Sequence, residues 1–146
     1  MKKLALNMYE KYSRQALPSK KYRELLGSAV CVFNSNNQFI IENILRTDNS
    51  NYNWHDLIDK TSGELSEPIK NTITKKSNTK IASLFGELIS KRNRIIHSFQ
   101  ITDNNDQILK TKDKKHEQYN ITEEYLLEFI KDNGVLSDML HQFRGY

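Results

Sequence analysis

Three residues of this 146-residue sequence, Arg92, Asn93 and His97, have types and a spacing that could do chemistry. An arginine can hold a phosphate, because its guanidinium stays charged at any physiological pH. An imidazole can take up or release a proton near neutral pH, which suits it to general acid or base catalysis. Arginine and histidine on one segment are therefore typical of phosphate chemistry. A buried ion pair and a structural histidine would give the same pattern.

The sequence predicts that a helix over residues 79–99 carries all three side chains. The apolar residues that fall within about 60° of Arg92 on a helical wheel include Ile81, Phe85, Leu88, Ile95, Ile96 and Phe99. Arg92 therefore interrupts an apolar stripe, where its charge needs an anion, a dipole or an open cleft. Two alternatives are an extended side chain whose charge reaches solvent and an internal ion pair with an acid such as Glu42. Asn93 and His97, four residues apart, would share one flank of the helix.

The segment Arg92-Asn93-Arg94-Ile95-Ile96-His97, followed by Ser98-Phe99, resembles the signature of the HEPN superfamily. That signature is an arginine followed by a polar residue and, a few positions later, a histidine. Residues 84–91 look like the usual lead-in to the motif. The expected order of elements, with a long early helix and a closing helix after an insertion, is also similar to the family layout.

The resemblance implies a metal-independent endoribonuclease without a cofactor, commonly a toxin of a toxin–antitoxin or anti-phage defence system. Two copies would form one composite cleft in a homodimer. His97 would act as the base toward the ribose 2′-hydroxyl or as the acid toward the leaving 5′-oxygen. Arg92 would stabilise charge on the phosphate, and Asn93 would orient His97 or the phosphate. The RNA products would carry 2′,3′-cyclic phosphate and 5′-hydroxyl ends. An antitoxin or a nucleotidyltransferase is an allowed partner. The alternative is an inactive HEPN-like module that binds RNA or a protein.

The positive charge is concentrated in one part of the chain. Residues 70–97 contain seven lysines and arginines against one acid, Glu87, a local balance of +6. Such a potential attracts RNA, although a solvated lysine-rich surface gives the same count. The residues expected to contact RNA are Lys91, Arg94, Lys110, Lys112, Lys114 and Lys115. Tyr119 and Tyr125 could stack on bases, although Tyr125 also fits the core spacing of the last helix.

Composition and motifs argue against several other classes of protein. A single cysteine and four scattered histidines do not form a zinc-binding set. The five glycines form no phosphate-binding loop. No apolar run reaches the length of a membrane-spanning helix, and the first residues lack the apolar core of a signal peptide. We therefore expect a cytoplasmic protein without a membrane segment or a metal.

The expected fold is all-α, a single HEPN-like domain over residues 1–146 built as an antiparallel bundle of four to five helices. Helical periodicity and capping residues predict helices over residues 3–16, 22–45, 54–60, a short stretch after Thr61, 79–99 and 122–143. Ser19, Thr61 and Thr122 are expected to cap the helices that follow them. The polar residues 34–37 weaken the middle of the long second helix, and residues 29–33 alone could pass for a strand. Residues 107–121 are expected to form a basic insertion, either a loop or a small hairpin.

Overall fold

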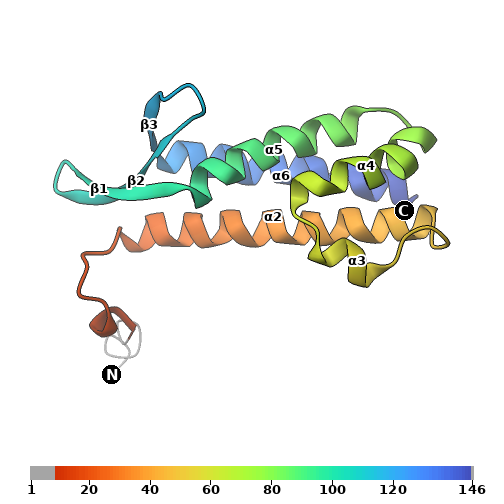
Figure 1. Cartoon of the computed structure of the whole chain (residues 1–146). Helices are drawn as coiled ribbons and strands as arrows, with labels where there is room; N and C mark the ends of the chain where they lie inside the picture. Colours follow the sequence, from red (N-terminus) through yellow and green to blue (C-terminus); the bar gives the residue numbers. More distant parts are fainter. Residues whose placement is uncertain (1–8, 146) are drawn as a thin grey trace.

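The computed structural model describes residues 9–145, in which three long helices lie side by side and a small sheet extends from one end (Figure 1). The long helices are α2 (Lys20–Thr47), α5 (Lys80–Ile96) and α6 (Glu123–Arg144). The strands β1 (Ser98–Asp103), β2 (Asp106–Lys112) and β3 (Gln118–Ile121) form one antiparallel sheet in the order β1-β2-β3. The all-α prediction was therefore wrong, because the fold is α+β.

The first long helix, α2, forms as one uninterrupted element, as predicted. Ser19 caps it, since its hydroxyl accepts a hydrogen bond from the backbone N–H of Tyr22. The polar patch at residues 34–37 does not break the helix, because Asn36 is buried and its amide donates to the backbone and side-chain oxygens of Asn133 on α6. The polar patch that weakens the helical prediction thus supplies a polar contact between α2 and α6.

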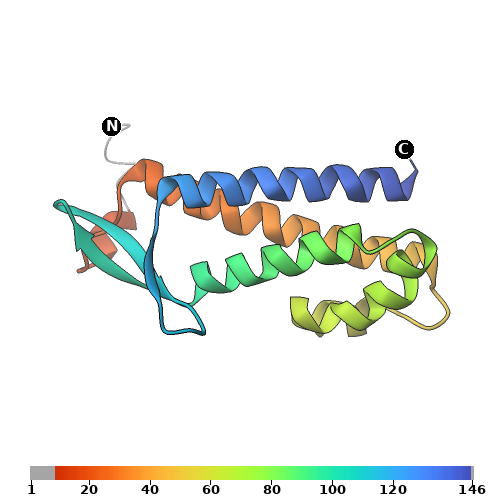
Figure 2. The same cartoon turned by 90° about the horizontal axis from the view of Figure 1, so that it is seen from above.

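Short helices join α2 to α5 at the end of the bundle away from the sheet (Figure 2). They are α3 (Trp54–Asp59), the 3₁₀ turn η2 (Ser62–Leu65), α4 (Ser66–Ile69) and the π-helical η3 (Lys70–Thr74). The predicted cap at Thr61 is confirmed as a reciprocal capping box with Glu64. Pro68 lies in the first turn of α4, where its missing N–H costs no helical hydrogen bond.

The helix expected to reach residue 99 ends at Ile96, and the chain enters β1 at Ser98. Of the two structures expected for the basic segment 107–121, the hairpin is confirmed and the loop is wrong, because the segment supplies the antiparallel strands β2 and β3. Asn104 and Asn105 connect β1 to β2 with φ angles of 50° and 69°, the geometry of a two-residue hairpin turn for which asparagine is well suited. The β1–β2 hairpin begins only two residues after the helix. The apolar residues of its first strand happen to continue the spacing of the apolar residues of α5, and for this reason the sequence predicted a longer helix.

Tyr22 fastens the sheet to the helices from within the core. Its hydroxyl donates to the carbonyl of Ile121 at 2.5 Å and accepts from the backbone N–H of Leu109 at 3.1 Å. Burial raises the pKa of this phenol. Thr122 then caps α6, as predicted, by accepting from the N–H of Tyr125. Tyr22 of α2 therefore links the first long helix to strands β2 and β3, and β3 leads directly into α6.

The helix expected at residues 3–16 lies partly outside the described residues. Within them, only a 3₁₀ turn, η1 (Tyr9–Tyr12), forms before α2. Glu10 of this turn pairs with Arg23 of α2 at 2.7 Å. In the described part of the predicted helix, this one 3₁₀ turn is therefore the helical structure that forms.

Candidate functional site

The candidate catalytic histidine lies at the junction between α5 and the sheet. His97 is the C-cap of α5, and its backbone N–H donates to the carbonyl of Asn93 at 2.9 Å. The hydroxyl of Thr111 on β2 donates to the carbonyl of His97 at 3.4 Å. The backbone is thus held from both sides while the imidazole is exposed.

Arg92, one turn earlier, lies against the core, as its place in the apolar stripe predicts. Its guanidinium carbon lies 4.9 Å from the ring centroid of Phe33, and Phe33 stacks in turn on Phe85 and Phe129. A half-buried cation over a buried ring gains about 0.5–2 kcal/mol from the ring's negative face. Burial lowers the pKa of the Arg92 guanidinium below its usual value.

No carboxylate of the described residues forms an ion pair with Arg92, and its buried Nε has no hydrogen-bond partner there. Glu42, the acid considered as an internal partner, is exposed and lines a separate cavity with Phe39 and Arg144. The interpretation as an Arg92–Glu42 pair was wrong. The guanidinium keeps an unmet hydrogen-bonding capacity at the end of α5 nearest to His97.

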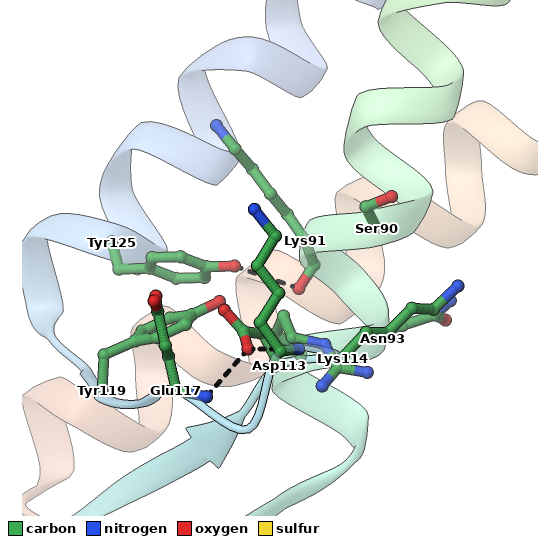
Figure 3. Close-up of a pocket in the computed structure, with 10 residues that line it drawn as sticks. Ser90, Lys91, Asn93, Asp113, Lys114, Glu117, Tyr119 and Tyr125 are labelled. Carbon is green, nitrogen blue, oxygen red and sulfur yellow. Dashed lines mark hydrogen bonds between the residues drawn. The ribbon is translucent and has the colours of Figure 1, made fainter.

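A cavity of about 450 Å³ opens between the last turns of α5 and the loop that joins β2 to β3 (Figure 3). The residues that line it are Ser90, Lys91, Asn93, Arg94, Asp113, Lys114, Lys115, Glu117, Tyr119 and Tyr125. Four of these ten are permanent cations and two are acids. The cavity is therefore net positive, a chemistry that favours an anionic ligand.

Among the described residues, two of the four cations have partners for their charged groups and two have none in the ion pairs found. Lys91 reaches Asp132 of α6 at 3.4 Å, and Arg94 donates to the backbone carbonyl of Lys112. Lys114 and Lys115 are exposed and form no ion pair with any residue that the structure describes. The two lysines of the loop can therefore approach a ligand without losing an internal contact.

The loop that carries these lysines is organised by its own hydrogen bonds. One oxygen of the Asp113 carboxylate accepts from the backbone N–H groups of Lys115 and Glu117 at 2.8 and 3.0 Å (Figure 3). His116 has a φ of 68°, the left-handed conformation that lets the loop turn back into β3. Asp113 is thus engaged in shaping the loop, whereas Glu117 makes no ion pair with a described residue.

Two tyrosines form the wall of the cavity near β3 and α6. The ring centroids of Tyr119 and Tyr125 are 6.1 Å apart. The Tyr125 hydroxyl donates to the backbone carbonyl of Lys91 at 3.3 Å, and burial raises its pKa. This hydrogen bond fixes one ring against α5, so the cavity has a rigid aromatic side.

The fold brings together some of the predicted site residues and separates others. Lys91, Asn93, Arg94, Lys114 and Lys115 share the cavity. Arg92, His97, Lys110 and Lys112 do not line it. Sequence reasoning missed Ser90, Asp113 and Glu117, of which only Asp113 carried a signal, the tendency of aspartate to form turns with following N–H groups.

The basic segment 70–97 does not form one patch. Lys75, Lys76 and Lys80 lie at the start of α5 or before it, and a helix rises about 1.5 Å per residue. Lys80 is therefore roughly 16 Å along the helix from Lys91. Only the end of α5 near the sheet combines the cations with the cavity.

His97 is flanked by two exposed apolar side chains. Ile96 is 54% exposed and Phe99 is 47% exposed, although both belong to the stripe that the sequence assigned to the core. The residues that the structure describes leave about half of each side chain uncovered, at the point where α5 ends and β1 begins. The exposed His97 thus has an exposed apolar residue on each side of it in the chain.

Within residues 9–145, no group of three or more His, Cys, Asp or Glu side chains is arranged to hold a metal ion. None of the described helices combines the length and the apolar character needed to cross a membrane. Comparisons with protein-family models, with curated proteins and with solved structures found no match to this chain.

Proposed function

We propose that this chain is a metal-independent endoribonuclease of the HEPN type, with a composite active site in a homodimer. The observation that carries the proposal is the exposed His97, held by its backbone at the end of α5, one turn from the half-buried cation of Arg92. The cationic cavity beside Asn93 supports RNA as the substrate. A role as a toxin or defence effector follows from the HEPN resemblance.

In this proposal the imidazole of His97 moves the proton. One His97 takes the proton of the ribose 2′-hydroxyl, and the 2′-oxygen attacks the adjacent phosphorus. The P–O5′ bond breaks, and the 5′-oxygen receives a proton from a protonated His97, which the second subunit can supply. The products are a 2′,3′-cyclic phosphate and a 5′-hydroxyl.

Arg92 has the chemistry to stabilise the phosphate in this step. Its charge is permanent, its Nε is unpartnered among the described residues, and its partial burial strengthens its interaction with an anion. The main chain of Asn93 holds the backbone of His97, because its carbonyl accepts the His97 N–H, and Asn93 itself lines the cationic cavity. The exposed Ile96 and Phe99 support a dimer, since apolar residues that one chain leaves uncovered can pack in a two-fold interface.

Substitution of His97 tests the proposal. We expect His97→Ala to abolish cleavage of a single-stranded RNA while the folding transition stays unchanged, because the residue is exposed and its truncation leaves no cavity in the core. His55→Ala is the matched control, since His55 is also exposed but lies on α3 at the other end of the bundle. RNA cleavage that persists in His97→Ala removes the histidine from the mechanism.

A second candidate, an inactive RNA-binding module, is favoured by one observation. The cavity that holds four cations is lined by neither Arg92 nor His97. This candidate predicts salt-sensitive RNA binding without cleavage at any protein concentration. The same assay with the unsubstituted chain, in the presence and absence of EDTA, separates the two functions.

A further inference from the structure

The cavity contains a carboxylate that a simple RNA groove would not need. Glu117 lies on the same loop as the unpaired Lys114 and Lys115 and forms no ion pair with a described residue. A carboxylate repels a phosphate backbone and lowers the affinity of a purely electrostatic site. Glu117 therefore weakens RNA binding unless it accepts hydrogen bonds from the RNA itself.

The bases of RNA differ in the donors that they can offer to such a carboxylate. Guanine presents two adjacent donors on its Watson–Crick edge, its N1–H and its amino group. Adenine, cytosine and uracil place an acceptor beside each donor on this edge. The two oxygens of a carboxylate match two adjacent donors and repel a neighbouring acceptor. Among the four bases, guanine is the one that Glu117 favours.

The rest of the cavity has the chemistry of a site for an unpaired nucleotide. Tyr119 and Tyr125 supply an aromatic wall, and the hydrogen bond from Tyr125 to the backbone of α5 keeps this wall in place (Figure 3). Stacking on such rings is a common way to hold single-stranded bases. The volume of about 450 Å³ is within the range of pockets that hold small ligands.

We propose that this cavity binds one unpaired guanine nucleotide of a single-stranded RNA, with Glu117 as the residue that selects guanine. The assignment rests on the proposed function, because it makes the cavity part of the RNA site that His97 serves. The ammonium groups of Lys114 and Lys115 contact the phosphates on either side of the base. The loop between β2 and β3 is therefore the specificity element of the protein.

Binding of intact RNA tests the assignment. The His97→Ala chain is titrated into two fluorescent uridine oligonucleotides that differ in one central base, guanosine or adenosine, and the anisotropy is measured. We expect the guanosine oligonucleotide to bind about tenfold more tightly, the low end of what one bidentate base contact contributes. Glu117→Gln should bring the two affinities within about twofold, because an amide offers one acceptor and one donor.

Glu67→Gln is the matched control, because Glu67 is exposed on α4 at the far end of the bundle. It should keep the guanine preference. Equal affinity of the His97→Ala chain for both oligonucleotides overturns the assignment. A preference for guanosine that survives in Glu117→Gln also overturns it.

Two further measurements separate this inference from the proposed function and from a free ligand. Cleavage of both oligonucleotides by the unsubstituted chain, with no difference in affinity between them, overturns the guanine assignment alone. A guanine preference without any cleavage supports the assignment of the cavity and contradicts the nuclease. Guanosine 5′-monophosphate that binds as tightly as the oligonucleotide shows a free-nucleotide site and overturns RNA as the ligand.

Discussion

The variant Tyr22→Phe, which removes one hydroxyl, should weaken the attachment of the sheet to the helices. The hydroxyl of Tyr22 serves two backbone groups, the carbonyl of Ile121 and the N–H of Leu109, and the side chain is 2% exposed. A buried backbone group that loses its partner costs about 1–3 kcal/mol. Two such groups, with some relaxation of the strands, give an expected loss of about 2–4 kcal/mol in the free energy of unfolding.

Thermal and urea denaturation measure this loss. For a chain of this length, 1 kcal/mol corresponds to about 3 °C, so Tyr22→Phe should lower Tm by roughly 6–12 °C. Hydrogen exchange should show the backbone amide of Leu109 losing its protection. Tyr12→Phe is the control, because Tyr12 is 83% exposed and should leave Tm unchanged. A loss in Tyr22→Phe below about 0.5 kcal/mol would refute the role of the hydroxyl as the link between sheet and helices.

Three further predictions concern charge, a buried amide and the cationic loop. Hydrogen bonds from Asn51 and Ser50 lower the pKa of Asp48 from 3.8 to about 2, so its ionised form stabilises the fold above pH 4 and this contribution is lost as the pH falls to 2. Asp48→Asn should therefore lower Tm near neutral pH, and its difference from the parent chain should shrink between pH 4 and pH 2. Asn36→Ala should cost about 1–3 kcal/mol in urea denaturation, because the buried side-chain oxygen of Asn133 on α6 loses the amide that donates to it. Joint Lys114→Ala and Lys115→Ala should reduce the slope of log affinity for single-stranded RNA against log salt by about 1.4, from two phosphate contacts.

Two of these predictions have a control variant within the same chain, and the third is checked by its dependence on pH. Asn34→Ala changes an exposed asparagine of α2 and should cost little, whereas a cost equal to that of Asn36→Ala would contradict a specific contact with α6. Joint Lys75→Ala and Lys76→Ala removes the same charge at the other end of α5 and should leave the salt slope unchanged. A Tm difference for Asp48→Asn that stays constant down to pH 2 would rule out the ionised carboxylate as its cause.

Local signals in the sequence predicted most of the helices and their ends. The caps at Ser19, Thr61 and Thr122 form as expected, because each depends only on a side chain and an N–H two or three residues away. The strands were harder to predict. The residues of β1 continue the apolar spacing of α5, so Phe99 fits a helix as well as a strand, and the choice depends on pairing with Lys110 in a distant segment.

The candidate site shows the same division between local and long-range information. Helical periodicity predicted that Arg92 lies on the apolar face, and the guanidinium does lie over Phe33. The same periodicity could not indicate that the β2–β3 loop folds back over α5, since this depends on the strand register. Asn93 and the loop residue Glu117 are therefore neighbours in one cavity although the sequence separates them by a hairpin. Whether His97 meets its copy in a dimer depends on a second chain.

Analysis of the ends of cleaved RNA tests the central claim most directly. Single-stranded RNA is incubated with the purified chain in EDTA, and the fragments are identified by mass spectrometry. We expect fragments with 2′,3′-cyclic phosphate and 5′-hydroxyl ends, and no cut where the attacking ribose is replaced by 2′-deoxyribose, because His97 has no hydroxyl there to deprotonate. Cleavage that continues at the 2′-deoxy position, or intact RNA at every protein concentration, would contradict the proposed nuclease.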